Sequence, residues 1–309
     1  MKTNYLLVSI IAVLAAACNR PSGKHLDTPI SGSIRIAADE SLRPIVEAEL
    51  QTFEGIYVKA TIDCDYLSEA DAIDALLKDS ARLAVVTRRF TAEEKKYFKG
   101  IQITPVEFDV AYSGIAVILN NQNADTVLTM DEIQSLLNGK IASWNQLGGK
   151  SRDGIEIVFD HPNSGLIRHL RDSVFHFEKL PSNVYAAENN AAVVDYVAKT
   201  PNALGFIGLE WISDKDDSVS NSFLSKVRVA SIAVNKDSAS YQPYQAYIAL
   251  KQYPLRRRIT VLSREARAGL GTGFLNFFAS ERGQRIVLKA GLVPKTMPLR
   301  IVRFNKDPL

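Results

Sequence analysis

Short apolar runs alternate with segments of helical periodicity along most of the chain. Residues 33–38 (SIRIAA) have the composition of a strand, and the segment 41–53 that follows offers Ile45, Val46 and Phe53 for burial on a helix. The alternation continues with strands expected at 56–62 and 82–87 and helices at 68–79 and 91–99. Strands that alternate with helices are typical of α/β units around a largely parallel sheet.

The middle of the chain contains an apolar stretch at 103–120 (ITPVEFDVAYSGIAVILN) that is longer than one ordinary strand and has a polar kink. We interpret it as two strands that share a crossing point between two lobes. A second α/β set follows, with elements expected at 130–139, 155–159, 165–175, 190–199 and 203–209. The apolar pattern at 273–291 predicts a final helix.

Three expected helices begin with a hydroxyl residue that is followed three residues later by a carboxylate. The pairs are Ser68/Asp71, Thr91/Glu94 and Thr129/Glu132. Each pattern predicts a capped helix start, and the carboxylates suit the positive end of the helix dipole.

The N-terminus predicts export. Residues 1–17 carry one basic residue, Lys2, and an apolar run that is shorter than the roughly 20 residues of a membrane span, which is typical of a secretory signal. Cys18 follows three alanines and resembles the lipidated cysteine of a bacterial lipoprotein; plain cleavage at the A-x-A motif is the alternative. Residues 18–32 are rich in Pro, Gly and Ser and predict a flexible tether. A lipidated Cys18 leaves Cys64 without a disulfide partner.

Composition and charge narrow the choice of function. The 309 residues are 46% apolar and 23% charged, which is ordinary globular composition with material for one or two domains. The net charge of +3 comes from 37 basic and 34 acidic residues that are mixed along the chain, so we expect no nucleic-acid partner.

Five motifs in order resemble the phosphate-binding proteins of bacterial ABC importers, within the periplasmic binding-protein superfamily. They are IRIAADESLRPIVEAE, LAVVTRRFTAEEK, LTMDEIQSLLNGKIASWNQLGG, PNALGFIGL and SERGQRIVLKAGLVP. The resemblance covers nearly all of the mature chain. It implies a two-lobed α/β clamshell, in which each lobe is a mixed, mostly parallel sheet flanked by helices. The first lobe is expected at 33–112 and the second at 113–230, and residues 231–309 return to the first lobe. The ligand then lies between the lobes, and hinge closure traps it.

The resemblance also implies which residues bind the ligand. In the family, hydrogen-bond donors come from three loops of the first lobe and one loop of the second. The matching positions are Ser41, Ser68, Thr87 and the run Asn163, Ser164, Gly165. Each hydroxyl is equally an ordinary N-cap, and the two roles are compatible because a capped helix start is also an anion site.

Several positions depart from the family pattern. Leu166 replaces the usual threonine of Ser-Gly-Thr, and Glu69 stands in a normally glycine-rich loop, where a carboxylate is unfavourable for an anion unless it points to solvent. Arg88 and Asp160 stand where the family has an aspartate and an arginine. We expect these two to approach each other across the closed cleft, with Arg88 donating to the anion; the alternative is that Arg88 and Arg89 form a solvated basic pair.

Other chemistry finds little support. Asp160, His161 and Ser164 are the residue types of a hydrolase triad, but they lie within five positions at one helix start and no G-x-S-x-G elbow occurs. The histidines lack metal-ligand spacing, and we interpret Arg256-Arg257-Arg258 as a solvated face. We therefore expect no enzyme, no cofactor and no metal.

The sequence thus predicts an extracytoplasmic lipoprotein, monomeric and anchored to a membrane, that captures an oxyanion. Inorganic phosphate is the first choice of ligand, and an ABC permease with its ATPase is the expected partner. The alternative is a non-transport lipoprotein that reuses the clamshell as a sensor or protein-interaction module. Leu166, Glu69 and the reversed charge pair favour that alternative, whereas Ser68 and Ser164 oppose it.

Overall fold

The computed structural model describes residues 27–149 and 152–298. The predicted signal at 1–17 and the lipidation site Cys18 lie outside these residues. Within them, no helix is both long and apolar enough to cross a bilayer.

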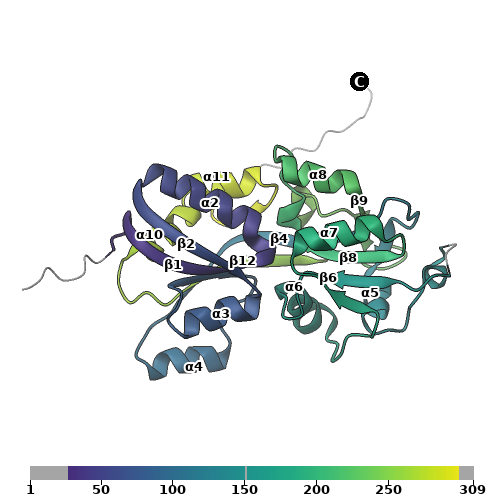
Figure 1. The fold of residues 1–309 in the computed structure, drawn as a ribbon, viewed down its shortest axis with the longest axis horizontal. Coiled ribbons are helices and arrows are strands. Elements are labelled where there is room, and N and C mark those ends of the chain that lie inside the picture. The colour runs from purple at the N-terminus through teal and green to yellow at the C-terminus, as the bar shows by residue number, and fades with distance from the viewer. Residues whose placement is uncertain (1–26, 150–151, 299–309) are drawn as a thin grey trace, which may run out of the picture.

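The first lobe is built on strands β2 (Lys59–Leu67), β1 (Ser31–Asp39), β3 (Leu83–Val86) and β12 (Arg256–Ser263), in that order. β1 pairs in parallel with β2 and β3, whereas β12 runs antiparallel to β3. Helices cover both faces (Figure 1): α2 (Arg43–Ile56), α10 (Leu270–Ala279) and α11 (Glu281–Lys289) on one side, and α3 (Glu69–Leu77) and α4 (Ala92–Gly100) on the other.

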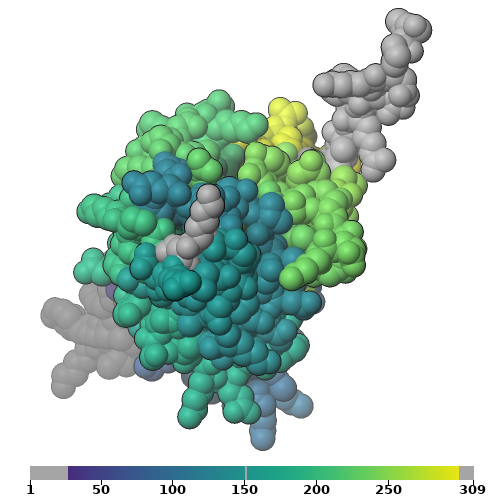
Figure 2. Space-filling model, turned by 90° about the vertical axis from the view of Figure 1, so that its right-hand side faces the viewer, coloured from purple at the N-terminus to yellow at the C-terminus, as the bar shows by residue number. Residues whose placement is uncertain are grey.

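The second lobe is built on strands β8 (Ala203–Gly208), β6 (Glu156–Phe159) and β7 (Val184–Ala186), which are mutually parallel. Its helices are α5 (Met130–Leu137), α6 (Gly165–Arg168) continued by a π-helix at His169–Phe175, α7 (Asn190–Lys199) and α8 (Ser218–Lys226). Figure 2 views this lobe end-on, where the teal middle of the chain lies beside the green segments that follow it.

One continuous strand joins the two lobes. β4 (Val106–Asn120) pairs with β12 and β13 (Val293–Pro294) through its first half and with β8 and β9 (Val227–Val229) through its second. The prediction of two strands at 103–120 was therefore wrong, because the same extended backbone serves both sheets. The crossing point between the lobes is confirmed.

The return of the chain differs from the expected boundary at 231. β10 (Ser231–Ala233) and β11 (Ser240–Tyr241) form a small sheet with β5 (Val127–Thr129), and α9 (Gln245–Ala249) follows before β12 enters the first sheet. The predicted final helix is two helices, since Ser280 has an extended backbone that ends α10 and its hydroxyl caps α11. The predicted tether also ends before residue 32, because Asp27 forms an ion pair with Arg267 and accepts from the Leu270 N–H at 2.7 Å.

The predicted helix starts are confirmed. Thr91 with Glu94 and Thr129 with Glu132 form complete capping boxes, and the Ser68 hydroxyl accepts from the Asp71 N–H at 3.2 Å. The Ser68 cap places the N-terminus of α3 next to the carboxyl end of β2, at the edge where open α/β sheets bind ligands.

Candidate functional site

The carboxyl ends of strands from both lobes face one cleft. In the first lobe, β1 ends at Asp39, β2 leads through Ser68 into α3, and β3 is followed by Thr87. In the second lobe, β6 leads through Asp160 to Ser164 at the start of α6. Helix N-termini that converge in this way present unpaired N–H groups and partial positive charge, which suit an anion.

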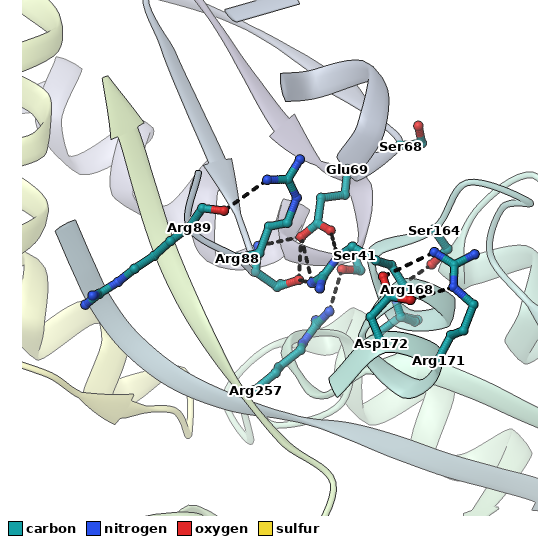
Figure 3. Close-up of polar contacts among 12 residues, drawn as sticks. Ser41, Ser68, Glu69, Arg88, Arg89, Ser164, Arg168, Arg171, Asp172 and Arg257 are labelled. Atoms are coloured by element: carbon teal, nitrogen blue, oxygen red, sulfur yellow. Dashed lines mark hydrogen bonds and ion pairs between the residues drawn. The ribbon is translucent and has the colours of Figure 1, made fainter. Parts of the chain in front are cut away.

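The Glu69 carboxylate lies at the centre of one cluster of donors (Figure 3). Its Oε1 accepts from the Thr87 N–H at 2.8 Å and from the Thr87 hydroxyl at 2.5 Å. The guanidinium of Arg168, from α6 of the other lobe, pairs with the same carboxylate through Nε and also donates to the Thr87 hydroxyl at 2.9 Å. Burial acts to raise the pKa of Glu69, but Arg168 and the Thr87 donors outweigh it and hold the pKa below its usual value.

A second cluster forms around Arg257, which lies on β12 and is 1% exposed. Its guanidinium donates to the Ser41 hydroxyl at 2.9 Å and to Glu210 at 2.8 Å. The interpretation of Arg256–Arg258 as a solvated face was therefore wrong for Arg257, whose side chain is fully buried against Glu210. The next residue, Arg258, remains half-exposed and pairs with Asp109.

Asn190 at the start of α7 makes a further contact between the lobes. Its side-chain N–H donates to Glu40 at 2.6 Å and to Asp160 at 3.1 Å, while its carbonyl accepts from the Gly208 N–H at 2.9 Å. Glu40 belongs to the first lobe, directly after β1, so this amide ties the two lobes together in the closed arrangement.

Carboxyl groups outnumber cations in these clusters. Asp39, Glu40, Glu69, Asp160 and Glu210 face two guanidinium groups, those of Arg168 and Arg257. Burial, reinforced by the charge of Glu69, raises the pKa of Asp39 to about 8 despite the opposing effect of Arg257. Burial likewise raises the pKa values of Glu40 and Asp160. At neutral pH the site therefore retains protons on part of its carboxyl groups.

Some buried oxygens of the site have no hydrogen-bond partner among the described residues. Asp39 uses Oδ1 to accept from the Ser41 N–H at 3.0 Å, and its Oδ2 is unpartnered. Asp160 similarly accepts through Oδ2, and its Oδ1 is unpartnered. Because unpaired buried polar atoms are unfavourable, a hydrogen bond to either of these two oxygens, one from each lobe, would stabilise the site.

The mouth of the cleft is a cavity of about 350 Å³ lined by both lobes. Its lining includes Glu69, Arg88, Ser164, Arg168 and Arg171. A larger cavity of about 600 Å³ lies elsewhere, between the segments 209–216 and 242–246. The smaller cavity is the candidate ligand site, because Glu69, Ser164 and Arg168 line it from both lobes.

The structure brings most of the predicted residues to the cleft. Ser41, Thr87, Asp160 and Ser164 are buried in or beside the two clusters, and Asn163 lines the mouth. Gly165 lies against the first lobe so closely that an added Cβ would be 2.1 Å from Asp39 Oδ2. The Ser68 hydroxyl caps α3 and donates to Asp71 at 2.5 Å.

The predicted ion pair between Arg88 and Asp160 was wrong. Both terminal nitrogens of Arg88 donate to Glu94, at 2.7 and 2.6 Å, because Glu94 lies in the first turn of α4, which begins just after Arg88 and is capped by Thr91. Asp160 is paired with Asn190 instead. Arg168 of the second lobe instead forms an ion pair with Glu69 of the first.

Sequence reasoning also missed functional residues. Arg168 lies four residues after Ser164, one helical turn along the same helix, a spacing that could have identified it. Arg257 alternates with the apolar Ile259 and Val261 on β12, and that period of two indicates a buried side chain. Nothing local marks Asn190, Glu40 or Glu210, which meet only through tertiary structure.

Together, the fold and the cleft define a two-lobed binding protein whose site lies between the lobes. A family model, the PBP superfamily domain, matches residues 23–282, so the chain belongs to the periplasmic binding-protein superfamily. Among curated proteins, the phosphate-binding protein PstS of Bacillus subtilis is 24% identical over 307 residues, covering 94% of this chain and 93% of that protein. PstS of Borreliella burgdorferi is 22% identical, covering 84% and 89%.

Solved structures share the fold. A candidate phosphate ABC transporter substrate-binding protein from Clostridium perfringens, solved with bound phosphate, superposes with a TM-score of 0.73 at 23% identity, over 85% of this chain and all of that one. An ABC-type phosphate transport receptor from Vibrio cholerae gives a TM-score of 0.65 at 19% identity, over 85% and 100%. The predicted two-lobed α/β clamshell is thereby confirmed.

Proposed function

We propose that this protein captures an oxyanion, inorganic phosphate first, between its lobes and delivers it to an ABC importer. One observation carries the proposal. A carboxylate, itself an oxyanion, is already bound in the cleft by a backbone N–H, a hydroxyl and an arginine from the opposite lobe. Donors of these kinds, converging from two lobes, are what a dehydrated oxyanion requires.

An unpartnered carboxyl oxygen favours phosphate over sulfate. Monohydrogen phosphate carries a proton that a carboxylate oxygen can accept, whereas sulfate at neutral pH carries none. We propose Asp160 Oδ1 for that role, because it has no hydrogen-bond partner among the described residues. Asp39 is not the acceptor, because burial raises its pKa to about 8 and keeps it protonated at neutral pH. A fully ionised anion would leave an ionised Asp160 facing negative charge, which selects against it.

The proposed ligand contacts modify the predicted set. We retain Ser41, Ser68, Thr87, Asp160 and the Asn163–Gly165 loop. Arg168 replaces Arg88 as the arginine that faces the anion, since Arg88 is already paired with Glu94.

The names of the relatives support delivery to a transporter over the sensor alternative. We propose that the protein acts outside the cytoplasm, held to a membrane through lipid on Cys18, and hands its ligand to a permease driven by an ATPase. We further propose that it works as a monomer and catalyses no reaction.

Calorimetry with phosphate and with sulfate tests the function, using protein that has been unfolded, stripped of ligand and refolded. We expect phosphate to bind and sulfate to bind at least tenfold more weakly. Ligand at 100 times its Kd should also stabilise the native protein by about 2.7 kcal/mol. Equal binding of both anions, or binding of neither, would reject phosphate as the ligand.

A further inference from the structure

Glu69 occupies a position that an anion site should not tolerate. It is the first residue of α3, next to Ser68, and it is 1% exposed. Its carboxylate does not turn to solvent, the orientation that would make it harmless to a bound anion. It points into the cleft and satisfies the Thr87 N–H, the Thr87 hydroxyl and Arg168 together (Figure 3).

These donors are the ones that the proposed ligand would use. A buried carboxylate and a bound oxyanion cannot both hold the same N–H and guanidinium groups, because like charges at contact distance are strongly unfavourable. One of them must therefore leave the donors before the other binds.

The same carboxylate also joins the lobes. Glu69 and Thr87 belong to the first lobe, and Arg168 belongs to the second, so the pair bridges the cleft in the closed arrangement. The ion pair is largely withdrawn from water, with side-chain exposures of 19% for Arg168 and 2% for Glu69, so water does little to weaken it.

We propose that Glu69 is a built-in substitute for the ligand. Its carboxylate holds the cleft closed without an anion, and the incoming oxyanion must displace it to reach Arg168 and Thr87. Glu69 therefore sets both affinity and selectivity, because a weakly interacting monovalent anion cannot compete with a carboxylate that is already in place. This inference rests on the proposed oxyanion-binding function.

Phosphate binds only those molecules in which Glu69 has left the donors, so the apparent phosphate affinity is the intrinsic affinity multiplied by that fraction. Removing the charge of Glu69 should free the donors in all molecules and restore the intrinsic affinity. In Glu69→Gln the side chain keeps its size but loses the ion pair with Arg168, so we expect phosphate to bind about tenfold more tightly than to the wild type. Without ligand, the variant should also open, which small-angle scattering measures as a larger radius of gyration.

Glu47→Gln is the matched control, because Glu47 forms an exposed ion pair with Arg43 in the same lobe. Its phosphate affinity and radius of gyration should equal those of the wild type. If Glu69→Gln does not fold, Glu69→Asp is used, since its shorter side chain draws the carboxylate back from Arg168 and Thr87 and should give a smaller gain in affinity.

The outcomes separate this inference from the proposed function. If the wild type binds phosphate and the variant binds it equally or more weakly, Glu69 is not a substitute for the ligand, while the proposed function stands. If neither protein binds phosphate, the proposed function fails and scattering decides: expansion in Glu69→Gln but not in Glu47→Gln supports the closing role, and no expansion overturns it.

Discussion

Gly165→Ala tests whether closure of the lobes is required for binding. Gly165 is the first residue of α6 and lies directly against the first lobe. A methyl group there would be 2.1 Å from Asp39 Oδ2 and 3.2 Å from atoms of Glu69. Alanine suits the start of a helix, so the second lobe should fold normally and the clash should arise only between the lobes.

The structure sets the size of the effect. Ordinary contact begins at 3.4 Å, so the separation must increase by 1.3 Å from 2.1 Å, either by a shift of the Asp39 carboxyl group away from the Ser41 N–H or by a parting of the lobes. The buried position of Asp39 favours the parting. A parting of that size lengthens the hydrogen bond from Arg168 Nη2 to Thr87 Oγ1 from 2.9 Å to about 4.2 Å, which breaks it. Loss of one charge-assisted hydrogen bond costs about 1.5–3 kcal/mol, so phosphate affinity should fall roughly 10- to 150-fold.

Calorimetry measures the affinity, and scattering measures the opening. Gly55→Ala is the control, because a Cβ at Gly55 in α2 meets nothing within 4 Å. The control should bind phosphate like the wild type. Wild-type affinity in Gly165→Ala, with an unchanged radius of gyration, would refute the claim that these two lobes must meet at Gly165 to hold the ligand.

Three further predictions follow from the contacts. Arg168→Gln should reduce phosphate affinity at least tenfold, whereas Arg88→Gln should change it less than threefold, because Arg88 is already paired with Glu94. Calorimetry measures both affinities, and equal losses would contradict the assignment of Arg168 as the arginine that faces the anion. Burial raises the pKa of Glu49 to about 9, and neither carboxyl oxygen has a hydrogen-bond partner within residues 27–149 and 152–298, so the native state holds a proton that the unfolded chain releases above about pH 4.5. The free energy of unfolding should therefore fall as pH rises from about 4.5 to 9. At pH 8, Glu49→Leu should be more stable than the wild type by about 2 kcal/mol, which urea denaturation measures as a higher midpoint; an unchanged midpoint would refute this. The pKa of Asp39, raised to about 8, should likewise make the free energy of unfolding fall as pH rises from about 4 to 8. Asp39→Asn should remove this contribution, which is at most about 1.4 kcal/mol per pH unit, and denaturation of both proteins at several pH values measures the difference.

Local patterns in the sequence determined the elements of the fold. The capping pairs at Ser68, Thr91 and Thr129 predicted helix starts that the structure confirms, because a cap involves residues three apart and needs no distant partner. The same locality brought Ser41, Thr87 and Ser164 to the ligand cleft, since each stands at the carboxyl end of a strand or at a helix start.

Tertiary structure alone decided how charges are paired in that cleft. Sequence comparison suggested Arg88 with Asp160, yet Arg88 lies within reach of Glu94 in its own loop and pairs there. The partners Arg168 and Glu69 are 99 residues apart, and Arg257 and Glu210 are 47 apart. Pairing at such separations depends on the relative orientation of the two sheets, and the spacing of residues along the chain does not determine that orientation.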